Sequence, residues 1–88
     1  MYELVDVISV QVLDGFQVHL VFQDGAEGVI DLEHHLQGPI FEPLRSDPQF
    51  FRSVRVDRDA GTIVWPNGAD IAPETLYEEV KAVAKTVA

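Results

Sequence analysis

Three histidines are the side chains of this sequence that most resemble metal ligands. His34 and His35 are adjacent, His19 falls on the polar side of an alternating stretch, and Asp31 supplies a carboxylate. Imidazole and carboxylate groups together suit zinc or nickel. However, adjacent residues on a helix point about 100° apart, and no ligand spacing in the sequence supports a shared site. We therefore expect exposed histidines in loops, with no bound metal and no other cofactor.

The carboxylates do not follow the pattern of catalytic acids and bases. Asp57 and Asp59 flank a predicted turn, and Glu78 and Glu79 lie in a predicted helix. General acid–base catalysis needs a carboxyl group in a low-dielectric pocket that raises its pKa, and nothing here predicts such a pocket. Residues 67–70 lack the lysine and repeated glycines of a phosphate-binding loop. We therefore expect that the protein is not an enzyme.

The most distinctive stretch, residues 62–77, contains the only Trp and changes from a strand pattern to a helix pattern. Its first four residues are β-branched or aromatic and predict a strand, which Pro66 must end because it lacks an N–H donor. Asn67 and Gly68 predict a turn, since both tolerate positive φ. Pro73 then suits the first position of a helix.

This stretch has a structural and a functional interpretation, which are compatible. In the structural one, Trp65 fills the core and Asn67 sets the turn. Asp70 caps the helix, because Ala72 has no side-chain acceptor. In the functional one, four residues form a partner-binding or small-ligand patch, since Trp and Tyr are favoured interface anchors. These residues are Trp65, Asn67, Asp70 and Tyr77.

Apolar residues after Pro73 recur at helical spacing and predict a C-terminal helix with one apolar face. They are Leu76, Val80, Val83, Ala84 and Val87. Acidic residues gather in the first turns of this helix and lysines near its end, as the helix dipole favours.

Two alternating stretches, residues 4–12 and 16–22, predict a first hairpin. A three-residue loop at residues 13–15 would align the apolar faces and place Gly15 at the left-handed position of a bulge. The pairs predicted for this hairpin are Val12 with Phe16, Val10 with Val18, and Ile8 with Leu20.

The same reasoning predicts a second three-residue loop at residues 23–25 and a third strand over residues 26–30. The predicted pairs are Phe22 with Ala26, Leu20 with Gly28, and Val18 with Ile30. Because Gly28 has no side chain, it leaves a gap over Leu20 that a side chain from a helix can fill.

Two short helical turns and a second hairpin complete the expected fold. Asp31 and Asp47 cap the turns, and residues 53–57 and 62–65 form the hairpin. We therefore expect one small α+β domain spanning residues 1–88. Its mainly antiparallel sheet has about five strands, a three-stranded meander plus a hairpin, with one C-terminal helix packed on the sheet.

The chain is acidic, with 15 acidic and 6 basic side chains and a formal net charge of −9. This charge argues against direct nucleic-acid binding, which needs a basic surface, and against an anionic membrane surface. No apolar run approaches the roughly 20 residues of a membrane helix, and no leader pattern precedes the domain, so we expect a cytoplasmic protein. The acidity aids solubility or steers a basic partner.

Residues 65–77, which begin Trp-Pro-Asn-Gly, resemble the C-terminal hallmark of the family known as domain of unknown function 2442. Residues 20–25, 31–32 and 41–44 fit the same resemblance. It implies a small, largely uncharacterised bacterial protein. Members of that family are often encoded beside another small protein, in arrangements that resemble toxin–antitoxin pairs.

We therefore expect an acidic, non-catalytic module that binds another small protein of basic charge, as an antitoxin-like partner would. Two alternatives stay open. One is a small-molecule or metal-ligand sensor with a pocket between the sheet and the C-terminal helix. The other is a homodimer or larger homo-oligomer, formed through a strand edge or the apolar face of the helix.

Overall fold

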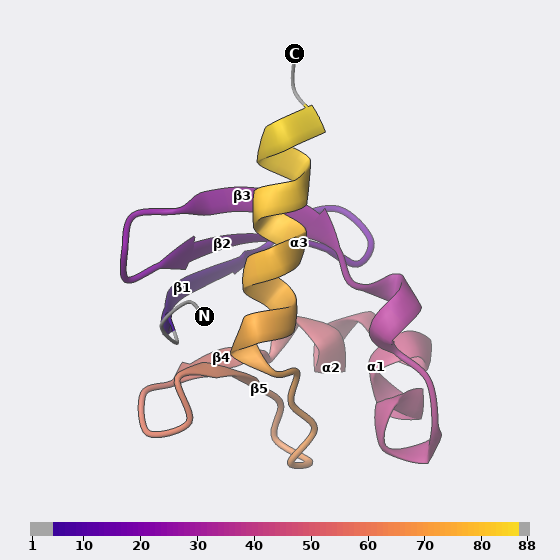
Figure 1. The fold of residues 1–88 in the computed structure, drawn as a ribbon. Helices are drawn as coiled ribbons and strands as arrows, with labels where there is room; N and C mark the ends of the chain where they lie inside the picture. Colours follow the sequence, from indigo (N-terminus) through magenta and orange to yellow (C-terminus); the bar gives the residue numbers. More distant parts are fainter. Residues whose placement is uncertain (1–4, 87–88) are drawn as a thin grey trace.

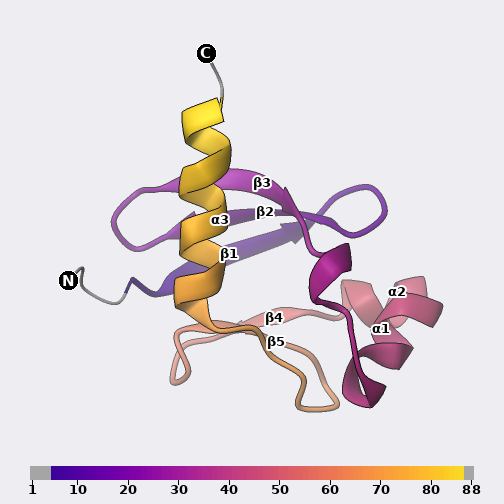
Figure 2. The same ribbon diagram turned by 45° about the vertical axis from the view of Figure 1, so that its right-hand side comes forward.

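The computed structural model describes residues 5–86 and the side chains of residues 5–83. Strands β1 (Val7–Val12), β2 (Gln17–Phe22) and β3 (Glu27–Asp31) form an antiparallel sheet in that order, and β4 (Arg55–Asp57) and β5 (Thr62–Val64) form a separate hairpin. Helix α3 (Pro73–Thr86) crosses one face of the three-stranded sheet (Figures 1 and 2). The predicted α+β fold is confirmed, and its five strands divide into a sheet of three and a hairpin of two.

Short helical segments link β3 to β4. They are η1 (Glu33–His35), η2 (Pro39–Phe41), α1 (Glu42–Ser46) and α2 (Pro48–Arg52). The Asp47 carboxylate caps α2 as predicted, because it accepts a hydrogen bond from the Gln49 N–H at 3.0 Å. The Asp31 carboxylate accepts one from the Glu33 N–H at 2.8 Å, but the N-cap of η1 is Leu32, so Asp31 supports the start of η1 from one residue before the predicted cap position.

The first hairpin has a different register from the predicted one. The Leu13 N–H donates to the Gln17 carbonyl at 2.8 Å, so the loop comprises residues 14–16, with Gly15 in the left-handed region at φ +58°. Val10 therefore pairs with Leu20, two residues from its predicted partner. Phe16 leaves the strand and packs edge-on against Phe51, with ring centroids 5.2 Å apart. A shift of two residues keeps the same faces together, which explains why the apolar faces still align.

A β-bulge interrupts β1 between Val7 and Ser9, where the pairing with β2 slips by one residue. Val7 pairs with Phe22 and is only 2% exposed, whereas Ile8 is 52% exposed. The predicted pairing of Ile8 with Leu20 is therefore wrong. The extra residue of a bulge changes which side chains face the core, and here it replaces Ile8 with Val7.

The second hairpin has the predicted register. Leu20 pairs with Gly28 and Val18 with Ile30, and the Phe22 N–H donates to the Ala26 carbonyl at 2.8 Å. The gap at Gly28 is filled by α3 as expected. A Cβ atom built on Gly28 would lie 3.3 Å from a methyl group of Val80.

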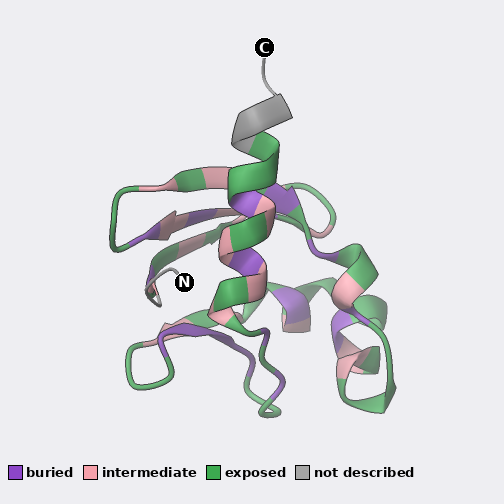
Figure 3. Cartoon of the chain, viewed as in Figure 1, coloured by how far each residue is buried: buried purple, intermediate pink, exposed green. Residues whose placement is uncertain are grey.

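The core lies between the sheet, α3 and the β4–β5 hairpin (Figure 3). Its most fully buried side chains are Val7, Val18, Leu20, Phe22, Leu32, Leu36, Leu44, Phe51, Ile63, Trp65, Leu76 and Val80. On α3, Leu76 and Val80 face this core as predicted, whereas Val83, predicted on the same face, is 39% exposed. The other predicted helix residues, Ala84 and Val87, lie outside the described side chains, and so does Leu4 of the predicted first strand.

Candidate functional site

Trp65, the first residue of the predicted patch, is 1% exposed. Its indole Nε1–H donates to the Phe51 carbonyl at 2.9 Å, and its ring packs against those of Phe51 and Phe41. A buried Trp usually needs such a partner for its N–H group. Trp65 therefore joins β5 to α2 and η2 and offers almost no surface to a partner.

Asn67 stabilises the loop after β5 through hydrogen bonds made by both polar atoms of its side-chain amide. The side-chain oxygen accepts from the Ala69 N–H at 3.1 Å, and the side-chain nitrogen donates to the Ile40 carbonyl at 2.8 Å. Gly68 follows at φ +89°, as the predicted turn requires. Asn67 itself is exposed and lies beside η2.

Asp70 does not cap α3. Its backbone forms an isolated antiparallel bridge to Val64, and its side chain is exposed. Among the described residues, no hydrogen bond to the Asp70 carboxylate is found. The bridge keeps Asp70 extended alongside β5, which accounts for the absence of the predicted cap.

Tyr77 lies on α3 and reaches the loop between β2 and β3. Its ring packs edge-on against Phe22 at 5.1 Å, and its hydroxyl donates to the Asp24 carboxylate at 2.6 Å. This hydrogen bond, the Ala26 N–H and the Lys81 charge lower the pKa of Asp24 below its ordinary value of 3.8. Trp65 and Asn67 thus both contact η2, whereas Tyr77 contacts the loop between β2 and β3, and partner binding by the four predicted residues stays a prediction.

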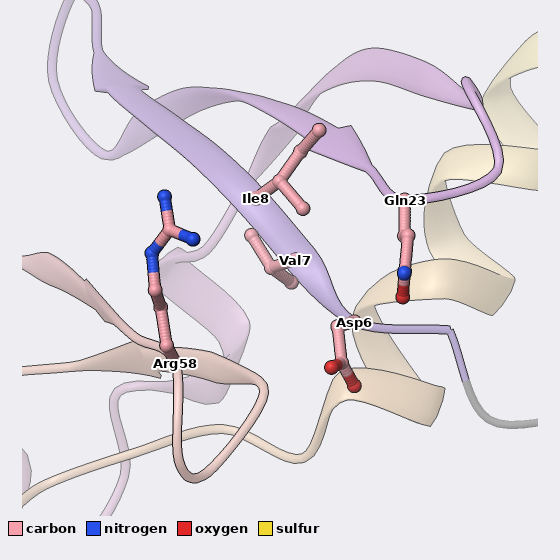
Figure 4. A pocket seen from close by; sticks show the side chains of 5 residues that line it. All are labelled: Asp6, Val7, Ile8, Gln23 and Arg58. Carbon is pink, nitrogen blue, oxygen red and sulfur yellow. The ribbon is translucent and has the colours of Figure 1, made fainter.

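A surface groove that sequence reasoning missed lies at the start of β1. It has a volume of about 260 Å³ and is lined by Asp6, Val7, Ile8, Gln23 and Arg58 (Figure 4). In Figure 4, Val7 and Ile8 lie centrally on β1, with Arg58 on one side and Asp6 and Gln23 on the other. The groove depends on the β1 bulge, for which the alternating sequence pattern carries no signal.

Two backbone hydrogen bonds fix the start of β1 to the two neighbouring turns that line this groove. The Val7 N–H donates to the Gly61 carbonyl at 3.0 Å, and the Gln23 N–H donates to the Asp6 carbonyl at 2.9 Å. Gly61 has φ +72°, and a Cβ atom there would lie 2.5 Å from the Asp6 carboxylate. The turn between β4 and β5 can approach β1 this closely because residue 61 is a glycine.

A second cluster, also missed, joins η1 to α3. His34 Nε2 lies 3.2 Å from one carboxylate oxygen of Glu79, and His35 Nε2 is hydrogen-bonded to the other. The centroids of the two imidazole rings lie 4.1 Å apart. The expectation that adjacent histidines point apart is therefore not met, because both side chains bend toward the same carboxylate. The alternative pair of His19 with Asp31 is not formed, since His19 contacts Glu27 at 2.9 Å.

The three donor atoms of His34, His35 and Glu79 all lie within 4.8 Å of one another. Two imidazole nitrogens and one carboxylate oxygen are ligands that zinc, copper, nickel and iron accept. The sequence contains both histidines side by side, but their joint approach to Glu79 depends on how α3 lies over η1. Only the tertiary structure reveals it.

The family model described as "Protein of unknown function (DUF2442)" matches residues 7–82. No curated protein and no solved structure matches the chain. Within the described part of the chain, no helix has the length and apolar character needed to cross a membrane.

Proposed function

We propose that this protein, which belongs to the DUF2442 family, is a non-catalytic binding module that recognises a small basic protein through the groove around Ile8. In this role it would act in the cytoplasm as an antitoxin-like partner and inhibit its target by covering the target's active surface. The observation that carries the proposal is the exposed Ile8 at the β1 bulge.

Ile8 and its neighbours have the composition of a small interface. An exposed apolar side chain lies at the centre, and Asp6, Gln23 and Arg58 surround it with polar groups. Protein interfaces commonly combine an apolar centre with a polar rim, and β-bulges often direct side chains at functional sites. The bulge interrupts the regular pairing of β1 with β2, and as a result Ile8 faces solvent.

The size of the groove favours part of a protein over a free metabolite. Its volume of about 260 Å³ is below the range of roughly 300–1,000 Å³ that is typical of small-molecule pockets. One or two side chains of a partner would fill it. The five lining residues include no histidine, serine or cysteine, so the groove itself supplies no nucleophile or imidazole base.

The net charge of −9 favours a basic partner, because complementary charge accelerates association and excludes acidic competitors. The edge strand β3 argues against self-association at that edge. Antiparallel pairing of two copies about Val29 would bring Glu27 of each copy next to Asp31 of the other. Like charges opposed across strands are destabilising, and charged residues are a common protection of sheet edges.

The proposal can be tested by affinity capture from the native host at low and high salt, followed by mass spectrometry. We expect a basic protein in near-equal amount with the unmodified chain, lost at high salt. Ile8→Asp should abolish the capture of that protein. Val29→Asp is the matched control, because Val29 is 40% exposed on the far strand of the same sheet and should leave capture intact.

Both variants must first give the circular dichroism spectrum of the unmodified chain. Capture that is equal with Ile8→Asp and the unmodified chain would refute the role of the groove. Loss of capture with Val29→Asp alone would instead assign binding to the β3 edge. Sedimentation of the unmodified chain as a concentration-dependent dimer would instead favour the homo-oligomer that the sequence leaves open.

A further inference from the structure

We propose that His34, His35 and Glu79 form a binding site for a divalent transition-metal ion, and that the ion joins η1 to α3. This site is separate from the groove at Ile8 and does not depend on the proposed protein partner. Its three ligands come from two elements, and His35 and Glu79 are 44 residues apart in the sequence.

The positions of the donor atoms are close to those that a metal requires. Zinc binds imidazole nitrogen and carboxylate oxygen at about 2.0–2.2 Å, which places neighbouring donors of a tetrahedral site roughly 3.3 Å apart. His34 Nε2 and Glu79 Oε1 already lie 3.2 Å apart, and all three donors are within 4.8 Å. Small rotations of the two imidazole rings would let one ion contact both nitrogens and the carboxylate.

The backbone that carries these ligands is anchored on both sides. Leu32 and Leu36 flank the two histidines and are fully buried, and the Leu32 N–H donates to the Phe16 carbonyl at 3.0 Å. On α3, the buried Leu76 and Val80 lie on either side of Glu79 in the sequence. A site on anchored elements needs little reorganisation to bind its ion.

The ligands also indicate the class of metal. Imidazole nitrogens select zinc, nickel, copper or ferrous iron over the hard cations magnesium and calcium, which prefer oxygen. Three protein ligands leave at least one coordination position for water, as in sites whose metal can act on a further ligand. Since 62% of the His34 side chain is exposed, such an ion would exchange with solvent.

Metal binding should stabilise the fold, because an ion bound only by the native state shifts the folding equilibrium by mass action. The Glu79 contacts with both histidines would be replaced by metal–ligand bonds. Each histidine must then present an unprotonated Nε2, so that its remaining ring proton lies on Nδ1.

The test is calorimetric titration of the untagged chain with zinc chloride and with nickel chloride, and with magnesium chloride for comparison. We expect one zinc or nickel ion per chain, no measurable magnesium binding, and a higher melting temperature with zinc. His34→Ala and Glu79→Gln should each weaken zinc binding more than about tenfold. Even substitution of a residue that only hydrogen-bonds to a metal ligand commonly lowers metal affinity about 10–100-fold.

His19→Ala is the matched control. It removes the imidazole of another histidine–glutamate contact, His19 with Glu27, which has only two donors and lies on the sheet. Zinc affinity should be unchanged in this variant. Nitrogen NMR of the unmodified chain gives a readout that does not depend on any variant, because zinc should shift the Nε2 signals of His34 and His35 only.

Three results would overturn the proposal. The first is the absence of zinc binding by the unmodified chain. The second is equal zinc affinity in Glu79→Gln, which would indicate nonspecific binding at the surface. The third is loss of binding in His19→Ala with unchanged His34 and His35 signals.

Discussion

The region around Trp65 buries a large apolar side chain, whereas the region around Ile8 exposes one. Trp65 is surrounded by β5, α2 and η2, and its one polar atom is hydrogen-bonded. Ile8 is turned toward solvent by a bulge in β1, beside a groove with one acidic and one basic side chain. In the proposed function, stability therefore depends on the region around Trp65 and recognition on the region around Ile8, so that substitutions should change one without the other.

The largest loss of stability is expected from Trp65→Ala. Truncating a buried Trp typically costs about 3–5 kcal/mol, because apolar contacts are lost and a cavity remains. Small domains have total stabilities of about 5–15 kcal/mol, so we expect a large loss of stability in urea unfolding followed by circular dichroism. A loss below about 1 kcal/mol, within the range of surface changes, would show that Trp65 does not organise this region.

A smaller loss in the free energy of unfolding is expected from Asn67→Ala, which removes the two side-chain hydrogen bonds to Ile40 and Ala69. Each such bond contributes about 0.5–1.5 kcal/mol to the free energy of unfolding. Asp70→Ala is the matched control, since its side chain lies in the same loop and is without a hydrogen bond in the described structure. Equal losses in the two variants would contradict the role given to the Asn67 amide.

Ile8→Asp should have little effect on stability, because the Ile8 side chain is exposed. Surface substitutions usually change the free energy of unfolding by no more than about 0.5 kcal/mol. We expect urea unfolding of this variant to match that of the unmodified chain, although capture of the partner is lost. A loss of several kcal/mol would mean that Ile8 contributes to the core, which would remove the basis of the proposed function.

The smallest effect on stability is expected from loss of the hydrogen bond between Tyr77 and Asp24. The pKa of Asp24 is lowered chiefly by the Tyr77 hydroxyl, so the ionised carboxylate is favoured in the folded state. Its contribution to stability is therefore present above the ordinary value of 3.8 and is lost as the pH falls through the lower folded value. Tyr77→Phe should raise this pKa toward 3.8, as measured by NMR titration of the Asp24 carboxyl carbon. An unchanged titration would show that the hydrogen bond does not hold in solution.

Local patterns were sufficient to predict much of the fold. The Asp24–Gly25 turn, the gap at Gly28, the cap at Asp47 and the start of α3 at Pro73 depend on neighbours in sequence or on one hairpin partner. Alternation of apolar residues also identified which faces of β1 and β2 meet. These features require only the short-range chemistry of turns, caps and strand faces.

The errors occur where a distant residue decides the outcome. Phe16 leaves its strand because Phe51, 35 positions later, provides an aromatic partner. The β1 bulge exposes Ile8, and strand alternation does not show where such a bulge occurs. The residue type of Trp65 makes it a candidate site residue, but its burial depends on α2 and η2. In the sequence, Glu79 is only one of two adjacent helix carboxylates, because its approach to His34 and His35 depends on the whole fold.

The packing of Val80 over Gly28 has a consequence for how the chain folds during synthesis. Residues 7–31 can pair as a meander as soon as they are made, but one apolar face of that meander is covered by a helix that begins only at Pro73. Contacts between segments so far apart in sequence form slowly, since a long loop must close first. A nascent or truncated chain that ends before α3 therefore exposes the apolar face with Leu20 and Ile30, and it would require a chaperone or rapid completion of the helix to avoid aggregation.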